Sequence, residues 1–189
     1  LNFQFITSNK KFALMGVHLS SMHMNSGIGD AVLSFMDSIS VLSNRPELSN
    51  IPFFINGYSW GGQFGYHFAR WLPEKILGLI SQKGGYHDTV FSHTALEIPM
   101  LFFVGENDLQ YRIENLSSIF YNHRQYGAKW AFLVEKNAAH AQINDDQFLN
   151  SYFDEVVNMR LSDSTDYYLS ILLNSLIDSI PWLGDNNLL

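Results

Sequence analysis

A chain of 189 residues, 47% of them hydrophobic, is long enough to fold as one domain around a substantial core. The 18 acidic residues outnumber the 11 basic ones, which gives a formal net charge of −7, and no lysine or arginine cluster occurs. We therefore expect no binding to nucleic acid or to an anionic membrane. The absence of cysteine excludes disulfides, thiolate metal sites and a cysteine nucleophile, and no apolar run approaches the roughly 18 residues of a transmembrane helix.

Short apolar segments alternate with segments of helical periodicity, a pattern typical of a parallel sheet with helices on its faces. We predict a first strand at residues 12–17. A helix follows, on which six apolar residues recur at helical spacing: Ile28, Val32, Phe35, Met36, Ile39 and Leu42. A second strand is expected at residues 51–56, apolar on both faces like a central parallel strand. The next helix extends from about Gly62 to Trp71, and Pro73 ends it.

Three further strands are predicted in the second half of the chain, at residues 76–81, 98–104 and 130–134. A helix between the last two of these strands ends before Gly127. The last helix begins after Asp145, a favourable N-cap residue. We therefore predict a core domain at residues 1–160 and a carboxyl-terminal tail at residues 161–189, which packs on the core or near its functional site.

The segment Gly57-Tyr58-Ser59-Trp60-Gly61 lies between a predicted strand and a predicted helix. A G-x-S-x-G segment in that context is a nucleophile elbow, a tight turn that exposes the serine hydroxyl. We expect glycine at both Gly57 and Gly61, because a Cβ on this turn would collide with the neighbouring strand or helix. The motif predicts that Ser59 attacks carbonyl groups.

A serine hydroxyl becomes a nucleophile when a histidine takes its proton and a carboxylate orients that histidine. Asp108 follows the fourth predicted strand, and His140 follows the fifth. Because the carboxyl ends of parallel strands meet at one edge of a sheet, we expect both side chains to lie near Ser59. Glu106 and Asp88 are alternatives for the acid.

Seven histidines are candidates for the base: His18, His23, His67, His87, His93, His123 and His140. Two of them, His123 and His140, follow Asp108 in the chain order serine, acid, histidine, and of these two only His140 lies on a loop after a predicted strand. His67 and His123 lie within predicted helices, where we expect packing or surface roles. The spacing of the histidines and acids does not match known metal-binding motifs, so we predict no metal site and no cofactor.

These motifs resemble those of α/β-hydrolases of the serine esterase type, and are similar to the dienelactone hydrolase and polyhydroxyalkanoate depolymerase-like branches. The resemblance rests on residues 52–64, Lys83-Gly84-Gly85-Tyr86, Gly105-Glu106-Asn107-Asp108 and Ala139-His140. It covers about residues 11–160, from the fourth strand of the family onward. It implies an α/β-hydrolase fold, a mostly parallel sheet with helices on both faces, incomplete at the amino-terminal side. It also implies Ser59 as nucleophile, His140 as base and Asp108 as orienting carboxylate.

Members of this family carry three more strands upstream, and a loop after the third supplies part of their oxyanion hole. In this chain we expect the Trp60 N–H group to be an oxyanion donor. Because those upstream strands are missing and the predicted strand at residues 12–17 has no neighbour to pair with, we expect the sequence to be a portion of a longer protein. It begins with Leu1 and shows no signal-peptide pattern, so its cellular location stays open.

The sequence therefore predicts a serine hydrolase that cleaves a small-molecule or polymeric carboxylic ester through an acyl-enzyme. Tyr58, Tyr86 and His87 are expected to line the substrate site, although the two tyrosines are equally compatible with plain packing. Peptidase, thioesterase and lipase activities use the same residues. A non-catalytic binding module that retains the fold is the alternative from another class. The sequence leaves the oligomeric state open.

Overall fold

The structure is a computed structural model, and it describes residues 12–18 and 20–161. Four strands form one sheet in the order β1-β2-β3-β4. Their bounds are β1 (Phe53–Tyr58), β2 (Ile76–Gln82), β3 (Met100–Gly105) and β4 (Trp130–Glu135). Each neighbouring pair is parallel, so all four carboxyl ends lie at the same edge of the sheet.

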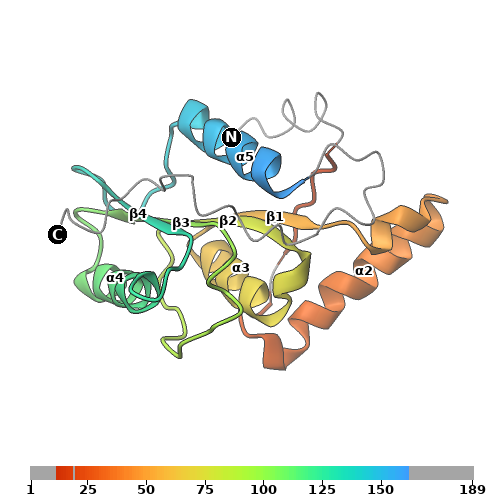
Figure 1. The fold of residues 1–189 in the computed structure, drawn as a ribbon, viewed down its shortest axis with the longest axis horizontal. Helices are drawn as coiled ribbons and strands as arrows, with labels where there is room; N and C mark the ends of the chain where they lie inside the picture. Colours follow the sequence, from red (N-terminus) through yellow and green to blue (C-terminus); the bar gives the residue numbers. More distant parts are fainter. Residues whose placement is uncertain (1–11, 19, 162–189) are drawn as a thin grey trace.

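Helices cover both faces of this sheet. Figure 1 shows α5 (Asp146–Arg160) on one face and α2 (Ile28–Leu42), α3 (Trp60–Trp71) and α4 (Gln110–Arg124) on the other. Three short 3₁₀ segments complete the described elements: η1 (Met24–Ser26), η2 (Pro46–Ser49) and η3 (Pro73–Lys75). The mostly parallel sheet between two helical layers confirms the predicted fold class.

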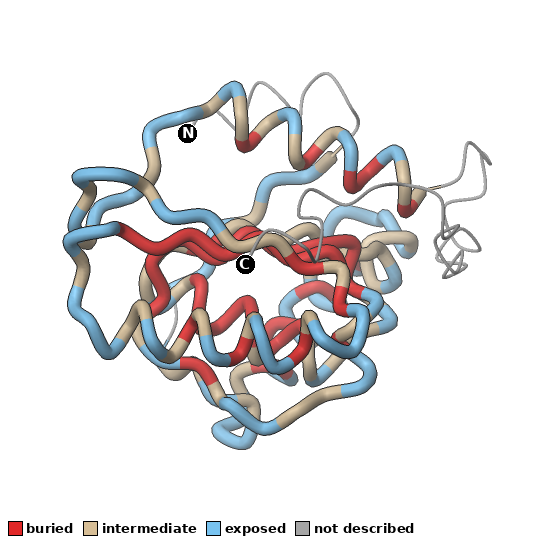
Figure 2. Tube along the Cα trace, turned by 60° about the vertical axis from the view of Figure 1, so that its left-hand side comes forward, coloured by how far each residue is buried: buried red, intermediate tan, exposed pale blue. Residues whose placement is uncertain are grey.

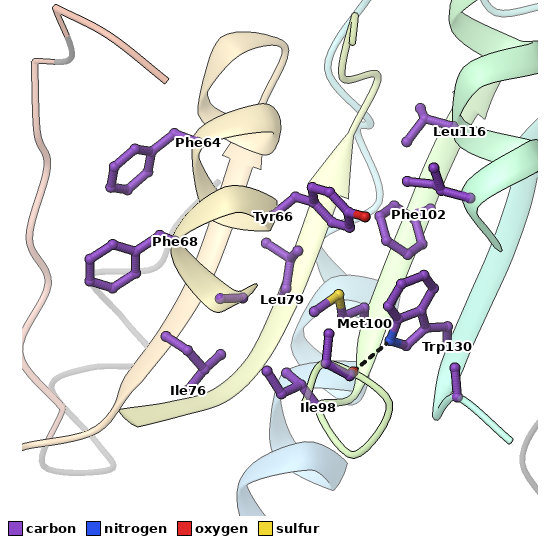
Figure 3. Packing of buried hydrophobic residues seen from close by; sticks show 14 of the residues in the cluster. Phe64, Tyr66, Phe68, Ile76, Leu79, Ile98, Met100, Phe102, Leu116 and Trp130 are labelled. Carbon is purple, nitrogen blue, oxygen red and sulfur yellow. Dashed lines mark hydrogen bonds between the residues drawn. The ribbon is translucent and has the colours of Figure 1, made fainter. Parts of the chain in front are cut away.

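The two central strands form the middle of the core, because every residue of β2 and β3 is buried (Figure 2). Side chains alternate between the two faces with the period of two expected for a strand. Leu79 and Phe102 face α3 and α4, whereas Ile80 and Leu101 belong to the cluster under Leu149 of α5. Figure 3 shows the larger of these clusters, which lies between the sheet and helices α3 and α4.

The predicted strand at residues 12–17 is wrong, because these residues form no regular element. Phe12 instead packs edge-on against Phe153 of α5, with ring centroids 5.1 Å apart. A strand needs a partner strand for its backbone groups. Within the described residues no strand pairs with the outer side of β1, so β1 is the outer strand of the sheet. The strand β1 is accordingly half-buried along most of its length, and the expectation of a central strand there was also wrong.

The remaining predicted elements are present, with boundaries that differ by a few residues. The predicted N-cap of α5 is confirmed, because the Asp145 side chain accepts a hydrogen bond from the Phe148 amide at 2.9 Å. Residues 162–189 of the predicted tail lie outside the described residues, and the division at residue 160 stays a prediction. Nowhere in residues 12–18 and 20–161 is a helix long and apolar enough to cross a membrane.

Candidate active site

Ser59 lies on a tight turn between β1 and α3. Its backbone has φ 53° and ψ −116°, a left-handed conformation that is rare for residues other than glycine and costs about 1–3 kcal/mol. The turn is held from both sides, because the Ser59 amide donates to the Gln82 carbonyl at 2.8 Å and the Ser59 carbonyl accepts from the Gln63 amide at 3.1 Å. The packing of strand against helix thus maintains a strained turn, as expected for a nucleophile elbow.

Close backbone packing explains only one of the two glycines predicted to be essential. A Cβ on Gly57 would overlap the carbonyl oxygen of Gly61, so glycine is required there. A Cβ on Gly61 would meet no atom within 4 Å, so the predicted collision at Gly61 is wrong. The second constraint falls on Gly62, where a Cβ would lie 2.6 Å from Ser81 Oγ. Helix α3 therefore lies close to β1 at Gly57 and close to β2 at its own Gly62.

Two hydrogen bonds connect Ser59, His140 and Asp108. The His140 Nε2 atom lies 2.9 Å from Ser59 Oγ, and the His140 Nδ1 atom lies 2.9 Å from Asp108 Oδ2. An ionised carboxylate accepts hydrogen bonds and donates none. The proton of neutral His140 therefore belongs on Nδ1, which leaves Nε2 able to take the serine proton.

The two alternative acids have other partners. The Glu106 carboxylate accepts from the Asn137 amide at 2.8 Å, and the Asp88 carboxylate pairs with Arg70 at 3.1 Å. Of the three carboxylates weighed from the sequence, Asp108 is the one that the structure joins to His140.

The Asp108 side chain is only 2% exposed. Burial alone would raise its pKa, but hydrogen bonds from His140, the Leu109 amide and Arg112 outweigh burial and lower the pKa below its usual value. The second oxygen, Oδ1, accepts from the Leu109 amide at 2.7 Å and from Arg112 at 2.8 Å. Asp108 is therefore ionised at neutral pH. Sequence reasoning missed Arg112, although its position four residues after Asp108 at a helix start was a usable signal.

The residues expected to line a substrate site have different environments. The Tyr58 hydroxyl donates to the His140 carbonyl at 2.9 Å, so it is occupied by the protein itself. Tyr86 is 57% exposed, and its carbonyl accepts from the Gln63 side chain at 2.7 Å.

His87 is fully buried, and its Nε2 atom lies 3.3 Å from Ser81 Oγ. Burial lowers the pKa of His87 to about 3, so its ring is neutral at neutral pH. The ring has no surface that a substrate can contact. The interpretation of His87 as a substrate-lining residue therefore lacks support from the structure.

Large apolar side chains are exposed beside the elbow and the acid. Trp60, directly after Ser59, is 58% exposed, and Leu109 and Tyr111, just after Asp108, are 53% and 54% exposed. Trp60 is also the first residue of α3, and the N–H groups of a first helical turn have no partner within the helix. The same edge thus presents apolar surface and backbone N–H groups without a partner inside the helix.

A cavity of about 530 Å³ lies beside α3 and the loop after β2. Its lining includes His23, His67, Trp71, Tyr86 and Phe91. Ser59, Asp108 and His140 are not among its lining residues, so this cavity is distinct from the serine–histidine pair. Tyr86 is the predicted site residue that reaches it.

The parallel sheet, the elbow and the order of residues at its carboxyl edge define an α/β-hydrolase. The sequence model of the dienelactone hydrolase family matches residues 10–168. The chain therefore belongs to the dienelactone hydrolase family.

Solved structures with a similar fold include two that are named as esterases. SOBER1 of Arabidopsis thaliana is 18% identical, with a TM-score of 0.54 over 75% of this chain and 67% of that one. Esterase PE8 is 14% identical, with a TM-score of 0.53 over 69% and 61%. A thermostable esterase is 21% identical, with a TM-score of 0.47 over 58% and 29%, so this chain spans less than a third of its length. At these identities the likeness concerns the fold, and comparison with curated protein sequences gives no match.

Proposed function

We propose that this chain carries the catalytic residues of a serine hydrolase that cleaves a carboxylic ester through an acyl-enzyme. The observation that carries the proposal is the pair of 2.9 Å hydrogen bonds from Ser59 to His140 and from His140 to Asp108. Membership of the dienelactone hydrolase family and the likeness to an esterase fold support the same reaction class.

In the proposed reaction Ser59 Oγ attacks the ester carbonyl carbon while His140 Nε2 takes the hydroxyl proton. The carbonyl oxygen becomes an oxyanion, to which the Trp60 N–H group at the positive end of α3 donates. Collapse of the tetrahedral intermediate breaks the bond to the alcohol oxygen, and His140 returns the proton to that oxygen. Water, deprotonated by His140, then attacks the acyl carbon. The bond from that carbon to Ser59 Oγ breaks, His140 returns the proton to Oγ, and the acid is released. Asp108 accepts the hydrogen bond from the His140 Nδ1–H group throughout and stabilises the imidazolium.

The substrate we propose is a small or polymeric ester with an apolar part beside the scissile bond. Trp60, Leu109 and Tyr111 offer exposed apolar surface next to the catalytic residues, and Tyr86 does so on the loop after β2. Burial of apolar surface contributes roughly 25 cal/mol per Å², so these side chains favour such a substrate over a charged one.

The test compares the unmodified protein with Ser59→Ala in hydrolysis of a nitrophenyl ester and in labelling by a fluorophosphonate. Ser59→Ala should lose both, because the attacking oxygen is gone. Ser151→Ala, which changes an exposed serine on α5, is the matched control and should keep both. Ester hydrolysis that persists in Ser59→Ala would overturn the mechanism.

The same assays decide between the alternatives. A binding module that retains the fold would not be labelled at all, whereas a hydrolase would be modified at Ser59. Matched ester, thioester and amide substrates then separate an esterase from a thioesterase or a peptidase. The proposal predicts the highest kcat/KM for the ester.

A further inference from the structure

The loop that carries the proposed base has no regular structure of its own. Residues 136–145 join β4 to α5 without a helix or strand. The position of this loop sets the distance between His140 Nε2 and Ser59 Oγ. A displacement of about 1 Å in such a geometry can cost on the order of 10²-fold in rate. The groups that fix the loop are therefore candidates for a role in the reaction.

The first of these groups is Tyr58, the last residue of β1. Its hydroxyl donates to the carbonyl oxygen of His140 at 2.9 Å. The two rings also contact each other, with centroids 5.3 Å apart. The residue before the nucleophile thus holds the backbone of the base, which links the two reacting side chains through a second contact.

The second group is the Lys83 ammonium, which is fully buried. It donates to the carbonyl oxygen of Ala141 at 2.8 Å and pairs with the Glu135 carboxylate. A buried ammonium is costly unless its charge is matched and its donors are used. Glu135 matches the charge, and the Ala141 carbonyl uses a second N–H. Lys83 lies directly after β2, so it ties the base-bearing loop to the central strands.

The third group is Gln82, the last residue of β2. Its side-chain oxygen accepts from the Ile143 amide at 3.1 Å, and its side-chain nitrogen donates to Asn56 on β1 at 2.7 Å. Three residues of the loop, His140, Ala141 and Ile143, are therefore held by side chains at the carboxyl ends of β1 and β2. The backbone carbonyls of His140 and Ala141 and the amide of Ile143 each have a fixed hydrogen-bond partner.

We propose that Tyr58 and Lys83 are positioning residues that hold His140 within reach of Ser59, while Gln82 fixes the far end of the same loop. This inference rests on the proposed function, since it concerns the base of that reaction. It replaces the sequence-based interpretation of Tyr58 as a substrate contact with a role through His140. It also assigns a role to Lys83, a buried lysine that does not contact the three reacting side chains.

The test uses Tyr58→Phe, which removes one hydroxyl, and Lys83→Met, which removes the ammonium and keeps most of the volume. We expect kcat for a nitrophenyl ester to fall about 10-fold in Tyr58→Phe and about 10- to 100-fold in Lys83→Met. KM should change little, because neither variant loses a substrate contact. A lost substrate contact at Tyr58 would instead raise KM with kcat unchanged, and that result overturns the positioning role.

Glu135→Gln separates positioning from simple stabilisation of the fold. This variant removes the charge partner of Lys83 but leaves the bond to the Ala141 carbonyl, so kcat should fall less than in Lys83→Met. Equal losses of kcat in the two variants, with equal losses of Tm, would show that Lys83 acts only through the ion pair. Tyr121→Phe, on the exposed surface of α4, is the matched control for Tyr58→Phe.

Hydrogen exchange of residues 138–143 supplies a readout that needs no activity. We expect hydrogen exchange in this loop to become about tenfold faster in Tyr58→Phe and in Lys83→Met, because each variant loses one hydrogen bond to the loop. If the unmodified protein neither hydrolyses esters nor is labelled, the proposed function fails, and exchange alone still decides whether these side chains hold the loop. If the unmodified protein hydrolyses esters and both variants keep its kcat, the positioning role is overturned.

Discussion

The interior of this molecule and the carboxyl edge of its sheet are held together by different kinds of contact. Between the sheet and helices α3 and α4, large apolar side chains such as Phe102 and Trp130 pack against one another, and Ser59, Asp108 and His140 are not part of this cluster. At the carboxyl edge of the sheet, single hydrogen bonds to backbone and charged groups decide where Ser59 and His140 lie. The comparison teaches that the interior should control stability, whereas the edge should control the reaction.

The largest expected effect at the edge comes from Asp108→Asn. An amide at this position favours the wrong histidine tautomer, and in other serine hydrolases such a change lowers kcat about 10⁴-fold. The loss should appear in steady-state kinetics, while the Tm from thermal unfolding stays close to the original. Asp37→Asn on the exposed surface of α2 is the control. Retention of more than about a tenth of the original kcat would contradict the role of Asp108.

The largest effect in the interior is expected from Trp130→Ala. The Trp130 ring is 1% exposed, stacks on His123 with centroids 4.3 Å apart, and donates to the Ala95 carbonyl at 3.1 Å. Its removal should lower the free energy of unfolding by about 3–5 kcal/mol, measured by urea denaturation. The fluorophosphonate labelling rate of the folded fraction should stay the same. A folded variant that is not labelled would break the division between interior and edge.

An intermediate effect is expected for His87, which is buried against the interior residues Tyr66 and Phe102. Burial lowers its pKa to about 3, whereas an unfolded histidine titrates near ~6.5. Between these two values the unfolded state binds a proton that the folded state excludes, so stability falls as the pH falls below ~6.5. The loss approaches about 1.4 kcal/mol per pH unit, or about 2 kcal/mol at pH 5.

Urea denaturation between pH 7 and pH 4.5 measures this dependence, with His87→Gln as the variant that cannot titrate. The pH dependence of the variant should be weaker by about one proton. Burial also lowers the pKa of His67 and of His123, and both residues remain in the variant, so the difference isolates His87. Equal slopes in the two proteins would contradict the buried neutral state of His87.

The smallest effect is expected at the start of α5. Asp145→Ala removes the acceptor of the Phe148 amide and should lower the free energy of unfolding by about 1 kcal/mol, with kcat unchanged. Thermal unfolding measures the change, and Asp145→Asn, which can still accept, should restore most of the stability. A loss of kcat in Asp145→Ala would show that α5 and the preceding loop are coupled more closely than the comparison implies.

Much of the fold could be predicted because local signals and tertiary packing agree. The apolar spacing of α2, the stop at Pro73 and the N-cap at Asp145 each correspond to an element of the structure. The prediction of a strand at residues 12–17 was wrong because an apolar segment becomes a strand only beside a partner strand. The predicted collision at Gly61 was wrong because the close approach of α3 to the sheet, which depends on tertiary packing, falls on Gly62 instead.

The sequence by itself determined the order of the chemical groups. Ser59 follows β1, Asp108 follows β3 and His140 follows β4, and parallel strands bring their carboxyl ends to one edge. Only the tertiary structure decided which atoms meet there. The Tyr58 hydroxyl and the Lys83 ammonium reach the loop of His140 across the sheet, and His87 is enclosed by the core, because packing between distant segments leaves no local pattern in the sequence.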